Sequence, residues 1–153
     1  MKALTIIQPF AELIASGVKR VENRTWYFKH RGPLAIHAGK SLKYGGQSIY
    51  EMAGYYDLPR ERLALGAVIA VVDVIDCVKL VVTPERVVVP TSAQSRHDWL
   101  NDHEHTEGPY CFVLANVRRL ARPLFMNGKQ GPFDVDDAAI AAIGFEKLAP
   151  ASV

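Results

Sequence analysis

The run GAVIAVVDVIDCVKLVV, residues 66–82, decides the fold class of this chain. It is long, almost continuously apolar and rich in β-branched side chains. Such a run is typical of a strand that is buried on both faces or bent around a barrel. Its apolar part is too short to cross a bilayer. The sequence therefore predicts a protein built around a buried β-strand.

Shorter segments on either side of this run complete the predicted architecture. The β-prone segments are residues 2–7, 19–28, 31–39, 110–124 and 127–135. The helical patterns are residues 8–17, residues from about Ser41 to 59, and residues 136–145, where Asp136 is the predicted cap. Short strands interleaved with a few helices predict an α+β fold, a small mixed β-barrel with helices over its ends.

Composition restricts the class of protein further. The chain has 153 residues, which suits one domain, and its 49% hydrophobic and 22% charged residues are ordinary for a globular protein. Cys77 and Cys111 stand alone in the sequence and predict reduced, buried thiols, with a disulfide between them as the alternative. Pro9 and Glu12 interrupt the apolar start, so neither a signal peptide nor a membrane span is expected. We expect a soluble, cytoplasmic protein without a cofactor.

Positive charge is concentrated in one part of the chain. Residues 17–43 hold seven Lys or Arg and one carboxylate, a net charge of +6, which leaves −4 for the rest of a chain whose net charge is +2. A cationic cluster on an otherwise acidic protein predicts an anionic partner at one face. The alternative is a set of solvated cations on loops.

The densest part of this cluster is SGVKRVENRTW, residues 16–26, directly after a predicted helix end at Gly17. In a strand, alternate side chains share a face. One face would then carry Lys19, Val21 and Asn23, and the other Arg20, Glu22, Arg24 and Trp26.

These residue types suit the recognition of single-stranded RNA. Arg24 and Arg31 would bind phosphate, Trp26 would stack on a base, and Glu22 would accept a proton or bind the amino edge of a base. The alternative is a structural ladder in which Glu22 bridges Arg20 and Arg24 while Trp26 lies in the core.

Two further motifs are weaker. HAGKS, residues 37–41, is not a phosphate loop, because the glycine required five residues before the Gly-Lys pair is Leu34. The backbone N–H groups of the helix predicted to begin there, aided by Lys40, would bind an anion, or the segment is an ordinary turn. HDWLNDHEH, residues 97–105, matches no zinc spacing and predicts a polar loop, so no metal site is expected.

Residues 2–135 resemble the ASCH domain, a relative of the PUA RNA-binding fold. The matching features are Gln8-Pro9 followed by the aromatic Phe10, the GxKxxExR stretch of residues 17–24, the strand RGPLAIHAGK at residues 31–40, the run at residues 66–78 and the turn NGKQGPFDV at residues 127–135. Phe10 replaces a common Trp, and residues 84–106 match nothing in the family pattern. The resemblance implies one domain over residues 1–148 with a tail at 149–153, a PUA-like barrel, and helices flanking a ligand cleft.

The same resemblance implies a function and a site. Lys19, Glu22 and Arg24 carry over as the family motif on the wall of the cleft, which would bind RNA or a nucleotide-like ligand. The neighbouring residues expected to take part in binding are Arg20, Asn23, Trp26, Arg31, His37 and Lys40. The oligomeric state is left open.

A nucleotide-directed hydrolase is the alternative function. One subgroup with this fold deacetylates acetylated cytidine with a Lys, a Thr and a Glu. Lys19 matches the Lys, Glu22 stands at the Thr position, and the distant Glu would come from residues 98–107. Other relatives cut RNA, for which Lys19 with Glu22 or His37 would serve as the base. The catalytic candidates are therefore Lys19 and Glu22.

Overall fold

The computed structural model describes residues 1–147, and the predicted tail at residues 149–153 lies outside them. The strands are β1 (Lys2–Ile6), β2 (Val21–Arg24), β3 (Gly32–Ala38), β4 (Lys43–Tyr44), β5 (Gln47–Ser48), β6 (Ala67–Lys79), β7 (Val81–Val82), β8 (Val87–Val88), β9 (Tyr110–Phe125) and β10 (Phe133–Asp134). The helices are α1 (Phe10–Ala15), α2 (Ile49–Gly54), a 3₁₀ turn (Arg60–Arg62), α3 (Thr91–Arg96) and α4 (Asp137–Ile143).

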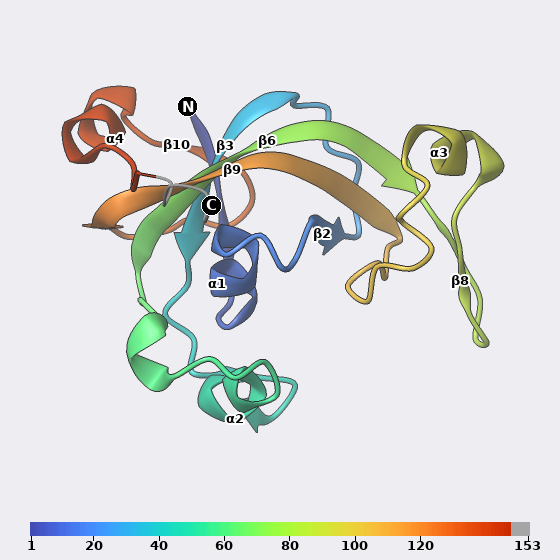
Figure 1. Ribbon diagram of the computed structural model, residues 1–153, viewed down its shortest axis with the longest axis horizontal. Helices are drawn as coiled ribbons and strands as arrows, with labels where there is room; N and C mark the ends of the chain where they lie inside the picture. The colour runs from blue at the N-terminus through green and yellow to red at the C-terminus, as the bar shows by residue number, and fades with distance from the viewer. Residues whose placement is uncertain (148–153) are drawn as a thin grey trace, which may run out of the picture.

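One six-stranded sheet organises the chain, in the order β10-β1-β3-β6-β9-β2 (Figure 1). β6 lies between β3 and β9, and its first six residues are all buried, which confirms the strand predicted from the apolar run. The α+β class is also confirmed. The closed barrel is wrong: within residues 1–147 the short strands β2 and β10 each pair with one neighbour, so the sheet ends at them.

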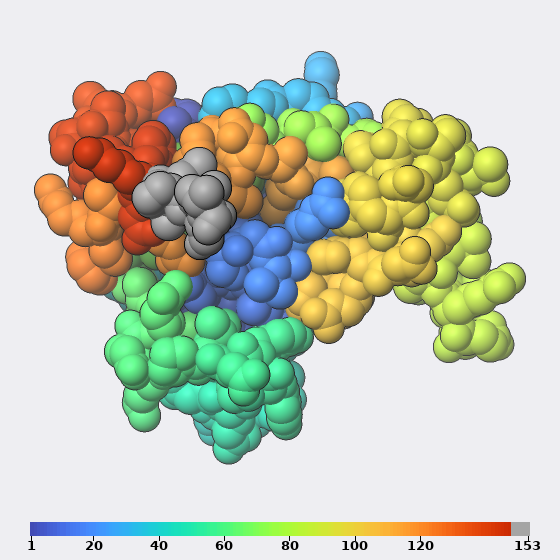
Figure 2. Space-filling model, viewed as in Figure 1, coloured from blue at the N-terminus to red at the C-terminus, as the bar shows by residue number. Residues whose placement is uncertain are grey.

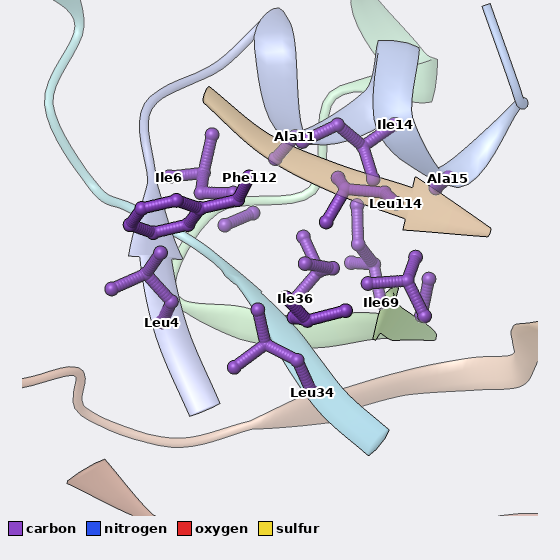
Figure 3. Close-up of a cluster of buried hydrophobic side chains, with 14 of the residues drawn as sticks. Leu4, Ile6, Ala11, Ile14, Ala15, Leu34, Ile36, Ile69, Phe112 and Leu114 are labelled. Carbon is purple, nitrogen blue, oxygen red and sulfur yellow. The ribbon is translucent and has the colours of Figure 1, made fainter. Parts of the chain in front are cut away.

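The two faces of the sheet carry separate hydrophobic clusters. On one face α1 packs Ala11, Ile14 and Ala15 against the sheet (Figure 3). The sheet residues of this cluster include Leu4, Ile6, Leu34, Ile36, Ile69, Phe112 and Leu114. On the other face α4 contributes Ile140 to a cluster with Ala35. Leu34, Ala35 and Ile36 thus alternate between the faces, as a strand requires, and each large apolar side chain buried this way stabilises the fold by about 1.5–3 kcal/mol.

The segment after β3 differs from its prediction. Residues 43–48 form the small hairpin β4–β5, since Gly45 and Gly46 turn the chain with φ of +57° and +80°. The helix α2 begins only at Ile49, where the Ser48 hydroxyl caps it by accepting a hydrogen bond from the Tyr50 N–H at 3.2 Å. The helix start expected beside Lys40 is therefore wrong, and with it the anion site at that helix start.

Residues 80–109 form a projecting lobe that the family pattern did not predict (Figure 1). The lobe carries the hairpin β7–β8 and α3. Leu80, Val89 and Leu100 are buried in a third cluster together with Val21 and Cys111 of the sheet. Leu100 thus anchors residues 97–105, the segment predicted as a polar loop, in this cluster.

Two further predictions concern the state of the two cysteine thiols and the absence of a membrane span. Cys77 and Cys111 are free and buried, as predicted, and burial raises the pKa of Cys111 to about 12. None of the helices in residues 1–147 has the length and hydropathy that a bilayer crossing needs.

Candidate functional site

A cavity of about 530 Å³ lies beside α1, between segments that are far apart in the sequence. Its walls come from residues 5–10, 19–24, 39–44 and 105–107. Residues 41–66, which carry β4, β5 and α2, form a second lobe. The lobe of residues 80–109 meets this second lobe next to α1 (Figure 2). The rings of His105 and Tyr56 lie 5.7 Å apart at that junction. The cavity therefore depends on the fold as a whole.

Lys19, Glu22 and Arg24 meet in one wall of this cavity. Oε1 of Glu22 accepts a hydrogen bond from Nζ of Lys19 at 3.0 Å, and Oε2 accepts from Nε and Nη2 of Arg24 at 3.1 and 2.9 Å. Nη2 of Arg24 also donates to the carbonyl of Thr5 at 2.9 Å. Lys19 and Glu22 are each only 6% exposed, so this wall holds two cations and one anion largely out of water.

The strand alternation expected for this segment is partly wrong. Glu22 and Arg24 share a face, but Lys19 joins them instead of pointing the opposite way. The reason is that β2 begins at Val21, while Lys19 lies in the turn after α1 and its N–H donates to the carbonyl of Leu13 at 3.0 Å. Glu22 therefore bridges Lys19 and Arg24, and the ladder from Arg20 to Arg24 does not form.

Next to this charged group the lining of the cavity is aromatic. Phe10 and Tyr44 pack edge to face with ring centroids 5.8 Å apart. Nζ of Lys19 lies 5.0 Å from the centroid of the Phe10 ring, within range of a cation–π contact. Apolar rings facing a few fixed charges suit a flat ligand with polar edges.

Asn23 fixes the loop that closes the cavity. Its Nδ2 donates to the carbonyl of His105 at 2.8 Å, and its Oδ1 accepts from the N–H groups of Glu107 and Gly108 at 3.0 and 2.8 Å. These bonds occupy the amide group, so Asn23 positions the loop. The loop in turn brings His105 and Glu107 to the cavity wall.

His105 is the residue that sequence reasoning missed. It is 5% exposed, and its Nε2 has no hydrogen-bond partner among the described residues, with Oε1 of Glu104 at 3.5 Å. Burial lowers the pKa of His105; Glu104 opposes this effect and Lys19 adds to it, so the ring is neutral near pH 7. An unsatisfied buried polar atom costs about 1–3 kcal/mol, which a bound ligand would offset. The only signal in the sequence was the density of polar residues around it.

Four of the predicted binding residues lie outside this cavity: Arg20, Trp26, Arg31 and His37. The guanidinium of Arg20 lies 3.8 Å from the centre of the Trp99 ring, and the backbone N–H of Arg20 donates to Nε2 of His103 at 3.1 Å. Trp26 packs against Phe112 of the main cluster, with centroids 5.2 Å apart. The core position for Trp26 was one of the two alternatives left open by the sequence.

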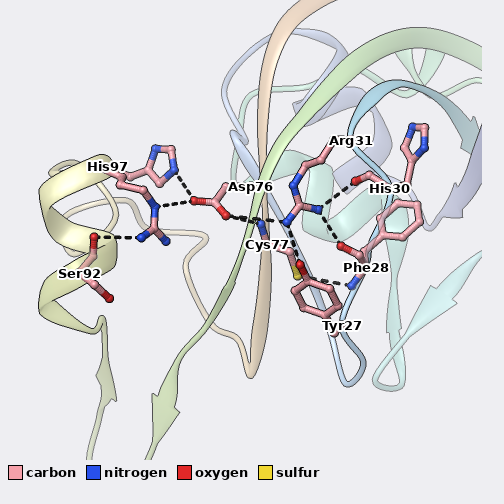
Figure 4. Close-up of polar contacts among 9 residues, drawn as sticks. Tyr27, Phe28, His30, Arg31, Asp76, Cys77, Ser92 and His97 are labelled. Atoms are coloured by element: carbon pink, nitrogen blue, oxygen red, sulfur yellow. Dashed lines mark hydrogen bonds and ion pairs between the residues drawn. The ribbon is translucent and has the colours of Figure 1, made fainter.

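Arg31 also belongs to a structural network (Figure 4). It donates to the carbonyls of Phe28 and His30 at 2.7 and 3.0 Å, and its guanidinium is 3.9 Å from Asp76. Asp76 further accepts hydrogen bonds from Arg96 and His97, both at 2.9 Å, which ties α3 to β6. Burial raises the pKa of Asp76, but these hydrogen bonds outweigh it and lower the pKa overall.

His37 does not line this cavity, but it contacts Thr5, which does. His37 is 2% exposed, with Nε2 2.8 Å from the carbonyl of Met126 and Nδ1 3.1 Å from Oγ1 of Thr5. A carbonyl only accepts, so Nε2 carries the proton and Nδ1 accepts from the hydroxyl. Lys40 is exposed and lines the cavity. Within residues 1–147 no three His, Cys, Asp or Glu side chains converge as metal ligands would.

Comparison with known proteins agrees with this fold. The ASCH domain family profile matches residues 4–123. Activating signal cointegrator 1 from Homo sapiens is 28% identical over 124 residues, which cover 76% of this chain and 19% of that protein. Its Mus musculus counterpart is 37% identical over 81 residues, 48% of this chain and 14% of that protein. The chain therefore spans less than a fifth of either relative.

A solved structure extends the likeness to most of the chain. The crystal structure of ASCH from Zymomonas mobilis superposes with a TM-score of 0.54, covering 95% of this chain and 96% of that one. The two sequences are 14% identical, so the likeness shows a common fold.

Proposed function

Because this chain belongs to the ASCH domain family, a relative of the RNA-binding PUA fold, we propose that it binds RNA or a nucleotide-like ligand in the cavity beside α1. One feature supports this function most directly: the Lys19–Glu22–Arg24 group and an aromatic pair line the same cavity of about 530 Å³. That volume is in the usual range for small-molecule sites, about 300–1,000 Å³. Residues 1–148 are the proposed functional unit.

The chemistry of the lining matches a nucleobase. A base would stack on Phe10 or Tyr44, whose rings lie in the apolar wall. Lys19 uses one of its three donors on Glu22 and has donors left for a carbonyl of the base.

Titration of a panel of ribonucleosides, acetylated cytidine and short RNAs tests this function. We expect Lys19→Met to weaken binding at least about tenfold, as for loss of a charge-assisted hydrogen bond. Lys79→Met is the control, because Lys79 is exposed on β6 and lines no part of the cavity. If an RNA strand contacts three or four of the cations, the slope of log affinity against log salt should be about −2 to −3. Absence of binding across the panel, in wild-type protein with a normal melting curve, would contradict the proposal.

Nucleotide hydrolysis is the second candidate, supported by the shared cavity of Lys19, His105 and Glu107. In RNA cleavage the neutral His105 ring would accept the proton of a ribose 2′-hydroxyl, and the 2′-oxygen would attack phosphorus. The bond from phosphorus to the 5′-oxygen would break, which leaves a 2′,3′-cyclic phosphate and a 5′-hydroxyl that takes its proton from water. Lys19 would stabilise the charge that develops on the phosphate. In deacetylation of acetylated cytidine, Glu107 would supply the distant carboxylate, while Glu22 at the Thr position departs from that subgroup.

Turnover separates the two candidates. For an enzyme, His105→Ala or Glu107→Gln should lower the rate about 100- to 10,000-fold while binding persists. Lys19→Arg keeps the charge and should preserve binding, so comparison with Lys19→Met isolates the role of the positive charge. Wild-type protein that binds RNA and turns over neither RNA nor acetylated cytidine would leave binding as the function.

A further inference from the structure

A second cavity of about 520 Å³ lies directly against the first. Thr5, Arg24, Gly39 and Lys40 line both. The second cavity is completed by His37 and by the glycine-rich turn NGKQG, residues 127–131. The two cavities thus form one continuous groove with two parts, long enough for a ligand larger than a nucleoside.

The two parts of the groove differ in charge. The first contains the carboxylates of Glu22 and Glu107 among its cations. Among the described residues, the second is lined by the cations Arg24, Lys40 and Lys129 and by no carboxylate. A phosphate is repelled by carboxylates and attracted by cations, so the second part is the favourable place for it.

Lys40 is fixed at the border between the two parts. Its Nζ donates to Oδ1 of Asn127 at 3.1 Å. The aliphatic part of the Lys40 side chain packs over Gly66. A Cβ added at Gly66 would lie only 2.5 Å from Cε of Lys40. The ammonium keeps two further donors for a ligand.

The turn at residues 127–131 is seated on the sheet through His37. The carbonyl of Met126 accepts from Nε2 of His37 at 2.8 Å. An added Cβ on Gly128 would collide with Oγ1 of Thr5 and lie 2.7 Å from Cε1 of His37, so only glycine fits there. His37 therefore supports the turn, and the turn presents Lys129 and its backbone to the groove.

We propose that the ligand is a phosphorylated nucleotide unit, with its nucleoside in the first cavity and its phosphate in the second, between Lys40 and Lys129. This assignment rests on the proposed function. The assignment also narrows the proposed function, because a site for a bare nucleoside needs no second part that is lined by cations alone. The nucleotide is free or is part of a single strand, and both carry the same phosphate.

The test compares each ribonucleoside with its 3′- and 5′-monophosphate and with oligonucleotides of two to six residues. We expect one of the monophosphates to bind at least about tenfold tighter than its nucleoside, as for one charge-assisted hydrogen bond. Lys129→Gln should remove most of this gain and leave nucleoside affinity unchanged, whereas Lys79→Gln, outside both cavities, should change neither. Lys129 is exposed, so its replacement should not disturb folding.

The outcomes are distinguishable. Nucleosides that bind as tightly as their phosphates, or a phosphate gain that survives Lys129→Gln, would overturn this inference and leave the proposed function standing. No binding by any member of the series would overturn both. Affinity that grows with oligonucleotide length, with a salt slope steeper by about 0.7 per added phosphate contact, would identify a strand as the ligand. Affinity that stops growing at the monophosphate would identify a free nucleotide.

Discussion

Glu22→Gln tests whether the wall of the cavity is a coupled ionic unit. The substitution removes the carboxylate that accepts from both Lys19 and Arg24 and leaves the shape nearly unchanged. The Lys19 side chain is 7% exposed, so its ammonium would remain buried beside a neutral amide. Removing one partner of a buried pair costs about 3–5 kcal/mol. We expect the lower end, about 3 kcal/mol, because Arg24 is 27% exposed and the Gln oxygen still accepts one hydrogen bond.

Urea unfolding at pH 7 measures this loss. With a urea dependence of about 2 kcal/mol/M, the midpoint should fall by about 1.5 M. The double variant Lys19→Met/Glu22→Gln should be more stable than the sum of its single variants predicts, since both members of the pair are then neutral. Glu107→Gln is the matched control: this carboxylate lines the same cavity but is exposed, and its loss should stay within about 0.5 kcal/mol. A cost below about 1 kcal/mol for Glu22→Gln, or additive single variants, would refute the coupling.

Three further predictions concern the supports of the site. Asn23→Ala removes three hydrogen bonds to the loop at residues 105–108 and should cost about 2–4 kcal/mol in urea unfolding. The free energy of unfolding should fall as pH drops below about 6.5. Burial lowers the pKa of His103 and His105 in the folded protein, so below this pH the unfolded chain binds more protons than the folded one. The double variant His103→Gln/His105→Gln should flatten this part of the profile. Cys111, with its pKa raised to about 12, should react with a thiol reagent at pH 8 only after unfolding, and rapid labelling of the native protein would contradict its burial.

The sequence predicted the sheet better than its surroundings. A run such as residues 67–72 is apolar on both faces, and only a central strand buries it completely, so the pattern has one structural solution. The hairpin at residues 43–48 was missed because Gly45 and Gly46 were counted as weak helix residues. Their positive φ values make a tight turn instead. Whether a sheet closes depends on the tilt and stagger of its strands, which periodicity does not report.

The site was predicted in part, because only some of its residues are close together in the sequence. Lys19, Glu22 and Arg24 are close in sequence, so a short segment was enough to bring them together. His105 and Glu107 are held at the cavity by long-range contacts, among them the hydrogen bonds that Asn23 makes across more than 80 residues. Local spacing carries no information about such contacts. Aromatic residues raised a similar difficulty, because stacking on a ligand and packing in a core favour the same residue types.

Stability alone is a poor explanation for the ionic wall of the cavity. A buried ion pair is often matched or exceeded in stability by apolar residues of similar volume. Lys19 and Glu22 nevertheless lie almost out of water in the wall of a cavity, next to the half-buried Arg24. Their mutual hydrogen bonds fix each charge in place before any ligand arrives, which reduces the entropy lost on binding. A wall of this kind trades some stability for donors and acceptors that are fixed in place, which is what the proposed binding of a polar ligand requires.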